Sequence, residues 1–165
     1  MHTALNSVRR NNQLINIFLS LLLPVLIFLS FNMHSKLKSN TYHGVIWADA
    51  AGYYAYLPMW FIYGNNAGRW PPDIEKNTGY GFVIDHENDV IRDKYFEGVA
   101  FLQAPFFMAA HIYQKISGGN ADGFNRSYIN SIIFASVFYT WLGIFLLFRI
   151  LKKRFTSTQS FFTVL

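Results

Sequence analysis

The sequence predicts an α-helical integral membrane protein in which two transmembrane helices are joined by a large extracytoplasmic loop. Two uncharged stretches carry this prediction: 25 residues lie between Arg10 and Lys36, and 22 lie between Arg126 and Arg149. Each stretch can form a helix of about 20 residues, which crosses a hydrocarbon core of about 30 Å. Only 14% of the residues are charged, roughly half the usual share of a soluble domain.

Composition also excludes several other classes of protein. Aromatic residues make up 19% of the chain, which argues against intrinsic disorder. The absence of cysteine excludes a disulfide scaffold. The net charge of +5 would suit a nucleic-acid partner, but the basic residues gather beside the uncharged stretches. The basic balance therefore reflects membrane topology, and we expect the lipid bilayer rather than a nucleic acid as a partner.

The first predicted transmembrane helix covers 14–33 and follows a short tail over 1–13. A secretory signal peptide is the alternative, with Arg9 and Arg10 as its basic region. The apolar run is too long for that, and no small-x-small cleavage pair follows it. An uncleaved anchor is favoured. Pro24 lies in mid-span, where it removes one backbone hydrogen bond.

The second predicted transmembrane helix covers 128–150, and a basic cluster follows it. Cytoplasmic segments carry the excess of lysine and arginine, so both ends of the chain are assigned to the cytoplasm and 34–127 to the outside of a bacterial inner membrane. Residues 151–165 resemble a polar turn followed by the start of a further hydrophobic segment. We therefore expect the chain to be the N-terminal part of a larger polytopic protein.

Three elements are predicted within the outer loop. Aromatic residues, which favour the membrane–water boundary, are dense around a helix at about 49–63. Two apolar runs flanking a polar turn predict a small β-hairpin at about 80–95. A helix at about 97–116 is interpreted as an interfacial helix, with a third membrane span left open as the alternative. Its more polar stripe should then face the outside; the stripe consists of Gln103, Ala110, His111 and Gln114.

Asp49 is the first candidate for chemistry. It stands alone among aromatic side chains soon after the first apolar stretch. Loss of hydration near a bilayer strengthens a carboxylate as a base, which would suit proton abstraction from a hydroxyl group. The competing interpretation is a helix N-cap, because aspartate is among the residues preferred there.

Two further clusters lie in the predicted hairpin. Asp85, Glu87 and Asp89 offer oxygen ligands, so a divalent cation is a possible cofactor, although a solvated turn explains them better. Arg92, Lys94 and Tyr95 could hold a lipid phosphate. For the basic residues, pairing with the acids of the opposite strand is the alternative.

The segment Trp47-Ala-Asp-Ala-Ala-Gly-Tyr-Tyr-Ala-Tyr-Leu-Pro follows the first apolar stretch and resembles the first outer loop of GT-C superfamily glycosyltransferases. Shorter segments beginning at Lys94, Pro105 and Ala121 resemble bacterial members associated with Bacteroidetes. The resemblance implies transfer of a sugar from a polyprenyl-phosphate donor to an acceptor hydroxyl, with inversion. It places the catalytic base at Asp49. Many members carry a second acid beside that position, where this chain has Ala50 and Ala51.

Substrate contacts under this hypothesis are assigned to residues near the base and on the hairpin, namely Tyr53, Tyr54, Arg92, Lys94 and Tyr95. The resemblance also implies that later spans and loops are needed, so the 165 residues alone are expected to be inactive. Two other classes compete with an enzyme. One is a non-catalytic membrane protein, such as an accessory subunit or part of a transporter. The other is a sensor with an extracytoplasmic loop.

Overall fold

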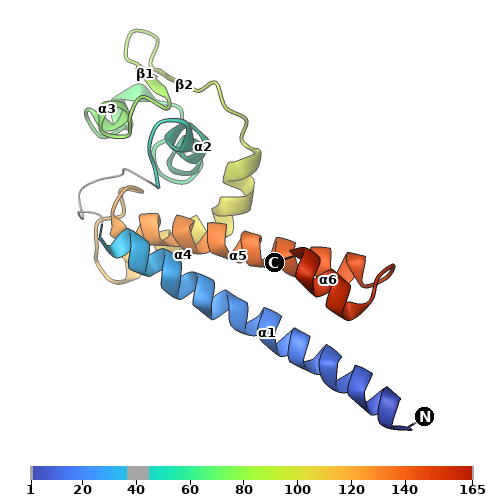
Figure 1. Cartoon of the computed structure of the whole chain (residues 1–165). Coiled ribbons are helices and arrows are strands. Elements are labelled where there is room, and N and C mark those ends of the chain that lie inside the picture. The colour runs from blue at the N-terminus through green and yellow to red at the C-terminus, as the bar shows by residue number, and fades with distance from the viewer. Residues whose placement is uncertain (1, 37–44, 165) are drawn as a thin grey trace. The chain divides into compact units, whose positions relative to one another are not determined.

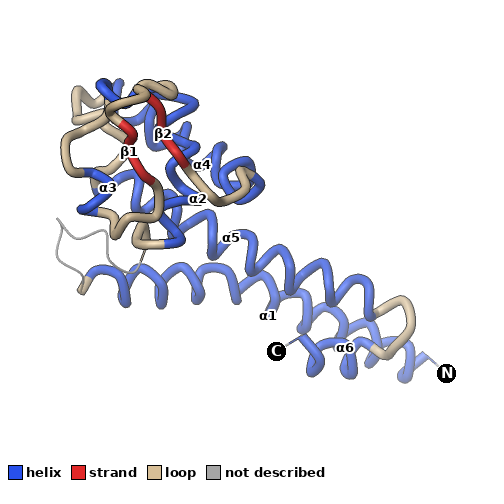
Figure 2. Tube along the Cα trace, turned by 90° about the horizontal axis from the view of Figure 1, so that it is seen from above, coloured by secondary structure: helices blue, strands red, loops and turns tan. Residues whose placement is uncertain are grey.

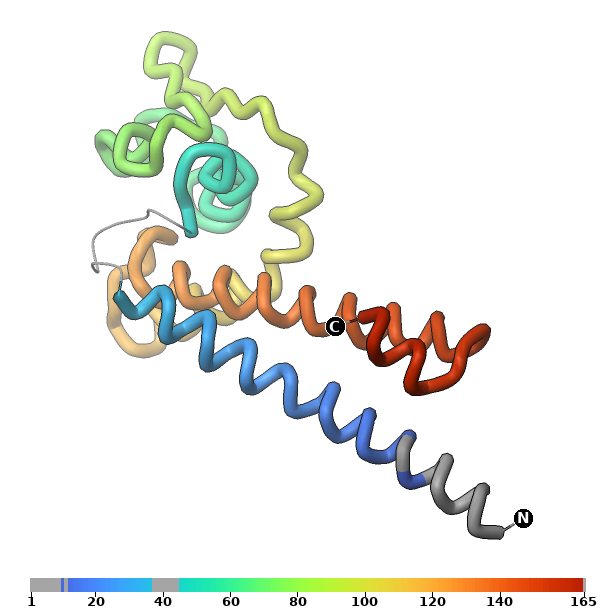
Figure 3. The backbone as a smooth tube through the Cα atoms, in the orientation of Figure 1, coloured from blue at the N-terminus to red at the C-terminus, as the bar shows by residue number. Residues whose placement is uncertain are grey.

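The computed structural model describes residues 2–36 and 45–164, and the side chains of 2–9 and 11 are not described (Figure 3). The start of the predicted loop, 37–44, and most side chains of the predicted tail, 1–13, therefore lie outside the described residues. The chain is mostly helical. It divides into two compact units: Met1–Asn32 together with Ser136–Leu165, and Met33–Ala135.

The first unit contains most of α1, His2–Ser35, the later part of α5, Arg126–Leu151, and α6, Ser157–Val164. In this unit α1 and α5 run antiparallel (Figure 1). Their contact buries Ile15, Leu19 and Phe148, with Ile144, Phe161 and Val164 packed against them. The indole N–H of Trp141 donates a hydrogen bond of 2.8 Å to the carbonyl oxygen of Leu19.

Two helical segments within the described residues are long and apolar enough to cross a membrane, Asn12–Ser35 and Arg126–Leu151. They cover the predicted spans 14–33 and 128–150. Pro24 lies inside α1, which continues as a helix to Ser35.

The second unit contains α2, Asp49–Pro58, which continues directly into a π-helical turn, η1, over Met59–Tyr63. One helix was predicted over about 49–63, and the structure has these two helical types in that range. The turn ends at Gly64, whose φ of 71° is in the left-handed region that glycine favours. A 3₁₀ turn, η2, Ala67–Arg69, and a short helix, α3, Ile74–Asn77, follow.

The hairpin consists of β1, Val83–Asp85, and β2, Val90–Arg92, which pair antiparallel with Ile84 opposite Ile91 (Figure 2). Its turn is stabilised by Asp85 Oδ1, which accepts hydrogen bonds from the backbone N–H groups of Glu87 (3.1 Å) and Asn88 (3.0 Å). Side-chain acceptors of this kind are typical of Asx turns.

The core of the second unit is aromatic. Helix α4, Gly98–Ile116, packs against α2. Four buried rings, hereafter the aromatic core, lie between α2, α4 and the start of α5: Tyr54, Phe107, Phe124 and Tyr128. Ring centroids are 5.9 Å apart for Tyr54 and Phe107 and 5.0 Å apart for Phe107 and Tyr128.

The orientation of α4 corrects one sequence-based expectation. His111 and Gln114 were expected on a stripe that faces the outside, but both are buried, with His111 Nδ1 2.7 Å from the Tyr128 hydroxyl. Gln114 donates to the Ser127 hydroxyl at 2.5 Å. These polar groups face the protein because α5 offers them hydrogen-bond partners. The exposed side chains of α4 are instead largely apolar, including Leu102, Ile112, Tyr113 and Ile116.

Candidate functional site

Asp49 is exposed in the first turn of α2, but it does not act as the helix cap. The N-cap residue is Ala48, with φ of 49° and no side-chain capping bond. Asp49 Oδ1 instead accepts a hydrogen bond from the Tyr95 hydroxyl. The alternative of a structural cap is therefore not what the structure shows. A negative charge in the first turn still interacts favourably with the helix dipole.

Tyr95 reaches Asp49 because two glycines allow a close approach between α2 and the chain around the hairpin. A Cβ atom on Gly52 would lie 2.1 Å from the Tyr95 ring, and one on Gly81 would lie 2.0 Å from the carbonyl oxygen of Ala48. Both separations are far below van der Waals contact, so any larger residue would push these segments apart.

Hydrogen bonds and a ring contact fix Tyr95 further. Its backbone N–H donates to Asp93 Oδ1 at 2.9 Å, and its carbonyl oxygen accepts from the Tyr56 hydroxyl at 2.5 Å. The ring of Tyr53 lies with its centroid 4.6 Å from that of Tyr95. The hydrogen bond to Asp49 is the largest cause of the raised pKa of Tyr95, with burial second, so its hydroxyl remains a donor at neutral pH.

Lys94 completes this arrangement, with its Nζ 5.0 Å from the centroid of the Tyr95 ring. Its interaction with the Tyr95 side chain is the main cause that raises the pKa of Lys94, and the charges of Asp49 and Asp93 act in the same direction. The structure thus brings four predicted site residues together. We call them the Asp49 cluster: Asp49, Tyr53, Lys94 and Tyr95.

Two predicted substrate-binding residues lie elsewhere. Tyr54 is 1% exposed in the aromatic core, and its hydroxyl donates to the carbonyl oxygen of Gly123. This burial contradicts the substrate contact predicted for it. Arg92 forms an ion pair of 2.5 Å with Asp85 on the neighbouring strand, which is the pairing considered as the alternative for it.

The three weak metal candidates do not converge on one point. Asp85 binds the turn backbone and Arg92, while Asp89 accepts hydrogen bonds from Asn66 (2.8 Å) and from the backbone of Gly68 (3.3 Å). Glu87 is exposed in the turn. Across 2–36 and 45–164, no group of three or more histidine, aspartate or glutamate side chains is arranged to hold a metal ion.

An open cavity of about 380 Å³ lies beside the hairpin and contains both basic side chains that the sequence assigned to phosphate. Its walls combine cations with apolar groups, as an anionic head group with a hydrocarbon tail would require. The cavity is lined by Tyr80, Gly81, Phe82, Val83, Arg92, Asp93 and Lys94.

Three residues of this region were missed by the sequence interpretation: Gly52, Gly81 and Asp93. Gly52 carried a usable signal, because glycine inside a helix often marks close approach of another backbone or ring. Asp93 carried none, since it occupies an ordinary position in the second apolar run of the hairpin.

No protein-family model, curated protein or solved structure matches the chain.

Proposed function

We propose that the chain is the N-terminal segment of a membrane glycosyltransferase that transfers a sugar from a polyprenyl-phosphate donor to an extracytoplasmic acceptor hydroxyl. Asp49 is the general base. The observation that carries this proposal is the hydrogen bond from Tyr95, which fixes Asp49 Oδ1. The other carboxylate oxygen makes no hydrogen bond with the described residues and is open to a substrate.

The proposed chemistry follows from this geometry. Asp49 takes the proton of the acceptor hydroxyl as its oxygen attacks the anomeric carbon. The bond between that carbon and the phosphate oxygen breaks, and the polyprenyl phosphate leaves with the bonding electrons. Attack on the face opposite the leaving group inverts the anomeric centre. Tyr95 acts as a positioning residue, because it holds the carboxylate in one orientation.

The phosphate of the donor is assigned to the open cavity beside the hairpin. Lys94 supplies a point charge there, and its raised pKa keeps it protonated. Arg92 lines the same cavity while paired with Asp85, and the apolar wall formed by Phe82 and Val83 suits the first carbons of a lipid chain. Lys94 contacts the Tyr95 ring, so the phosphate-binding and base-bearing residues are adjacent.

Burial of the two long helices supports their assignment to the membrane. Only 11% of the most apolar part of α1 and 28% of that of α5 are buried within the protein. A core helix of a soluble protein of this hydropathy would be mostly buried, since water disfavours so much exposed apolar surface. We therefore place both helices across a bacterial inner membrane, with both ends of the chain in the cytoplasm and 34–127 outside.

The exposed apolar side of α4 supports a helix that lies on the outer membrane surface. Ile112 is 50% exposed and Ile116 82% exposed, and Phe96, just before the helix, is 89% exposed. Apolar surface of this kind is stabilised at the boundary between lipid head groups and acyl chains. The outward face of α4 is thus the apolar one, whereas the sequence interpretation placed its polar stripe outward.

The substitution Asp49→Asn tests the catalytic assignment in the product of the whole reading frame. Asparagine keeps the size and can still accept from Tyr95, but it cannot take a proton. Sugar transfer from a polyprenyl-phosphate donor should fall about a hundredfold or more, the usual effect of removing a positioned base. Membrane insertion and expression should be unchanged.

Glu87→Gln is the matched control, because it removes one carboxylate from an exposed turn outside the Asp49 cluster. It should leave transfer near the wild-type rate. Transfer by the Asp49→Asn variant within a few-fold of wild type would remove Asp49 from the mechanism and favour a non-catalytic membrane protein.

Topology is tested separately by single cysteines at Asn66 and Asn88, both exposed in the second unit. The chain contains no native cysteine, so each substitution gives a single reporter. Both should react with a membrane-impermeant thiol reagent added from outside intact cells or spheroplasts. Reaction only after the membrane is broken would place 34–127 in the cytoplasm.

A further inference from the structure

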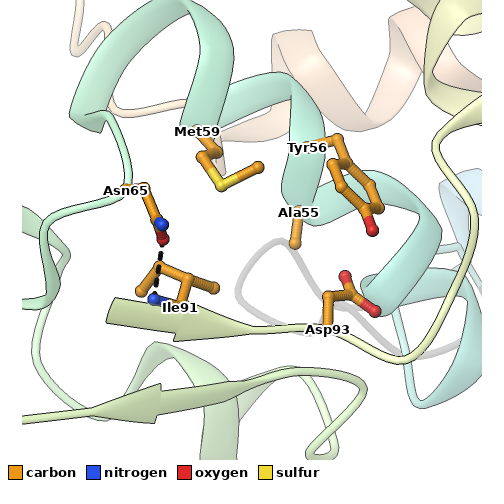
Figure 4. A pocket seen from close by; sticks show the side chains of 6 residues that line it. All are labelled: Ala55, Tyr56, Met59, Asn65, Ile91 and Asp93. Atoms are coloured by element: carbon orange, nitrogen blue, oxygen red, sulfur yellow. Dashed lines mark hydrogen bonds between the residues drawn. The ribbon is translucent and has the colours of Figure 1, made fainter. Parts of the chain in front are cut away.

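A small cavity between the α2–η1 segment and strand β2 is separate from the open cavity assigned to the phosphate (Figure 4). Its volume is about 150 Å³, and it is lined by Ala55, Tyr56, Met59, Asn65, Ile91 and Asp93. Figure 4 shows Asp93 and Tyr56 at one end of the group and Asn65 at the other.

Strand alternation distributes most side chains around the end of β2 between the two cavities. Successive residues of an extended chain point to opposite sides. Ile91 lines only the small cavity and Arg92 and Lys94 line only the open one, whereas Asp93 contributes to both. Asp93 is thus the one acidic side chain of the small cavity, while both basic side chains of this segment belong to the open one.

The Asp93 carboxylate is only half satisfied. Its Oδ1 accepts a hydrogen bond of 2.9 Å from the backbone N–H of Tyr95. Its Oδ2 is buried and has no hydrogen-bond partner among the described residues. A buried carboxylate oxygen without a hydrogen-bond donor is unfavourable, because its hydration is lost and no hydrogen bond replaces it.

The neighbouring side chains do not supply the missing donor. The Tyr56 hydroxyl donates to the carbonyl oxygen of Tyr95, and the Asn65 carbonyl oxygen accepts from the Ile91 N–H at 2.8 Å. The Arg92 side chain is paired with Asp85. No described side chain donates to Asp93 Oδ2, and a ligand in the cavity can supply that donor.

Charge in the recess favours a cationic donor over a neutral one. Burial is the main cause that raises the pKa of Tyr56, and the negative charges of Asp93 and Glu97 raise it further. The remaining wall is formed by Ala55, Met59 and Ile91, which suits methylene groups. A volume of about 150 Å³ holds only a few heavy atoms, given about 30 Å³ for one water molecule.

We propose that this recess binds a primary ammonium group on a short aliphatic stem, with the Asp93 carboxylate as its anchor. The ammonium group would donate to Oδ2, and the methylene groups would lie against the apolar wall. The ligand is either a free amine or the ethanolamine head group of a lipid, which presents the same chemistry. The proposal does not depend on sugar transfer and is tested by binding alone.

The test uses propylammonium chloride as the probe and the full chain in a non-ionic detergent. Binding is measured by saturation-transfer difference NMR, which detects magnetisation passed from the protein to the methyl protons of the probe. Propylammonium should bind, and 1-propanol, of nearly the same size but uncharged, should bind at least tenfold more weakly. Asp93→Asn should weaken propylammonium binding at least tenfold, because the charge-assisted bond is lost. Glu87→Gln should leave it unchanged.

Wild-type protein provides a second readout that does not depend on the variant folding. Burial raises the pKa of Asp93 above its ordinary 3.8, while hydrogen bonds from the backbone N–H groups of Tyr95 and Lys94, and then the charge of Lys94, oppose this shift. The other titratable side chains of this region, Tyr56, Tyr95 and Glu97, carry no positive charge in either protonation state. Propylammonium binding should therefore be present at neutral pH and disappear as the pH falls through the pKa of Asp93.

The source of the ligand is distinguished in lipid nanodiscs. If phosphatidylethanolamine nanodiscs reduce propylammonium binding relative to phosphatidylglycerol nanodiscs, the head group occupies the recess; equal binding in both identifies a free amine. Equal binding of propylammonium and 1-propanol would overturn the proposal. Unchanged propylammonium binding after Asp93→Asn would overturn it as well.

Discussion

Tyr53 and Tyr54 are neighbours on α2, yet they belong to two different regions of the molecule. A helix turns about 100° per residue, so adjacent side chains face different neighbours. Tyr53 is half-buried and packs against the Tyr95 ring in the Asp49 cluster, whereas Tyr54 is buried among Phe107 and Phe124. One helix thus serves a site on one side and the core on the other. Composition cannot distinguish the two tyrosines, but their position on the helix does.

The largest expected effect is a difference in stability between substitutions on the two sides of α2. Tyr54→Ala should lower the free energy of unfolding by about 3–5 kcal/mol, the usual loss for a large aromatic residue in a core. Tyr53→Ala should cost only about 1 kcal/mol, because the ring is partly exposed. Thermal unfolding in detergent, followed by circular dichroism, measures both. Equal losses would mean that the Asp49 cluster is as much a part of the core as Tyr54.

A smaller loss of stability is expected at Gly52, where the Tyr95 ring lies close to α2. Gly52→Ala should cost about 1–3 kcal/mol, since the new methyl group overlaps the Tyr95 ring. It should also separate Tyr95 from Asp49, which a shift of the Tyr95 ring resonances in an NMR spectrum would report.

Gly98→Ala is the matched control for this substitution. Gly98 begins α4, and a Cβ atom there would meet no other atom within 4 Å. Alanine at that position should be neutral or slightly stabilising, because it favours the helix. Should the Gly52 variant behave like the Gly98 variant, the approach of Tyr95 to α2 would not be needed for the fold.

The smallest expected effect is a pH dependence of stability that arises from His111 in the polar part of the core. Burial, and then the charge of Lys115, lower the pKa of His111 below its ordinary 6.5. The folded state therefore binds fewer protons than the unfolded state between these two values, so stability is complete above pH 6.5 and falls as the pH drops below it. The slope cannot exceed about 1.4 kcal/mol per pH unit.

His111→Asn should flatten the dependence between pH 7.5 and 5.5, and His86→Asn, in the exposed hairpin turn, should not. Urea unfolding at several pH values provides the measurement. A slope that survives in the His111 variant would assign the titration to another group.

Local pattern was enough to predict some of this architecture. The two uncharged stretches lie where the structure has α1 and α5, and the polar turn lies between two strands. The spacing of Asp49 and Tyr53, four residues apart on a helix, also places them on one side. These features depend on residues close together in the sequence.

What could not be predicted depends on distant partners. Tyr95 lies 46 positions from Asp49, and no periodicity specifies that contact. The polar stripe of α4 was assigned to the outside because its partners on α5, Tyr128 and Ser127, were unknown. Asp93 was not singled out, because its burial follows only from the packing of β2 near α2 and η1.

The hydrogen bond from Trp141 to Leu19 has a consequence for the order of folding. Its two residues are separated by 122 positions, so the contact cannot form until that length of chain has been synthesised. At about 5–20 residues per second, synthesis of this interval takes roughly 6–25 s. During that time α1 has to persist without α5, with Leu14, Ile17 and Phe18 facing its surroundings as they still do in the folded chain. Lipid stabilises exposed apolar side chains of this kind, so insertion of α1 into the membrane, as proposed above, would stabilise it before α5 has been made.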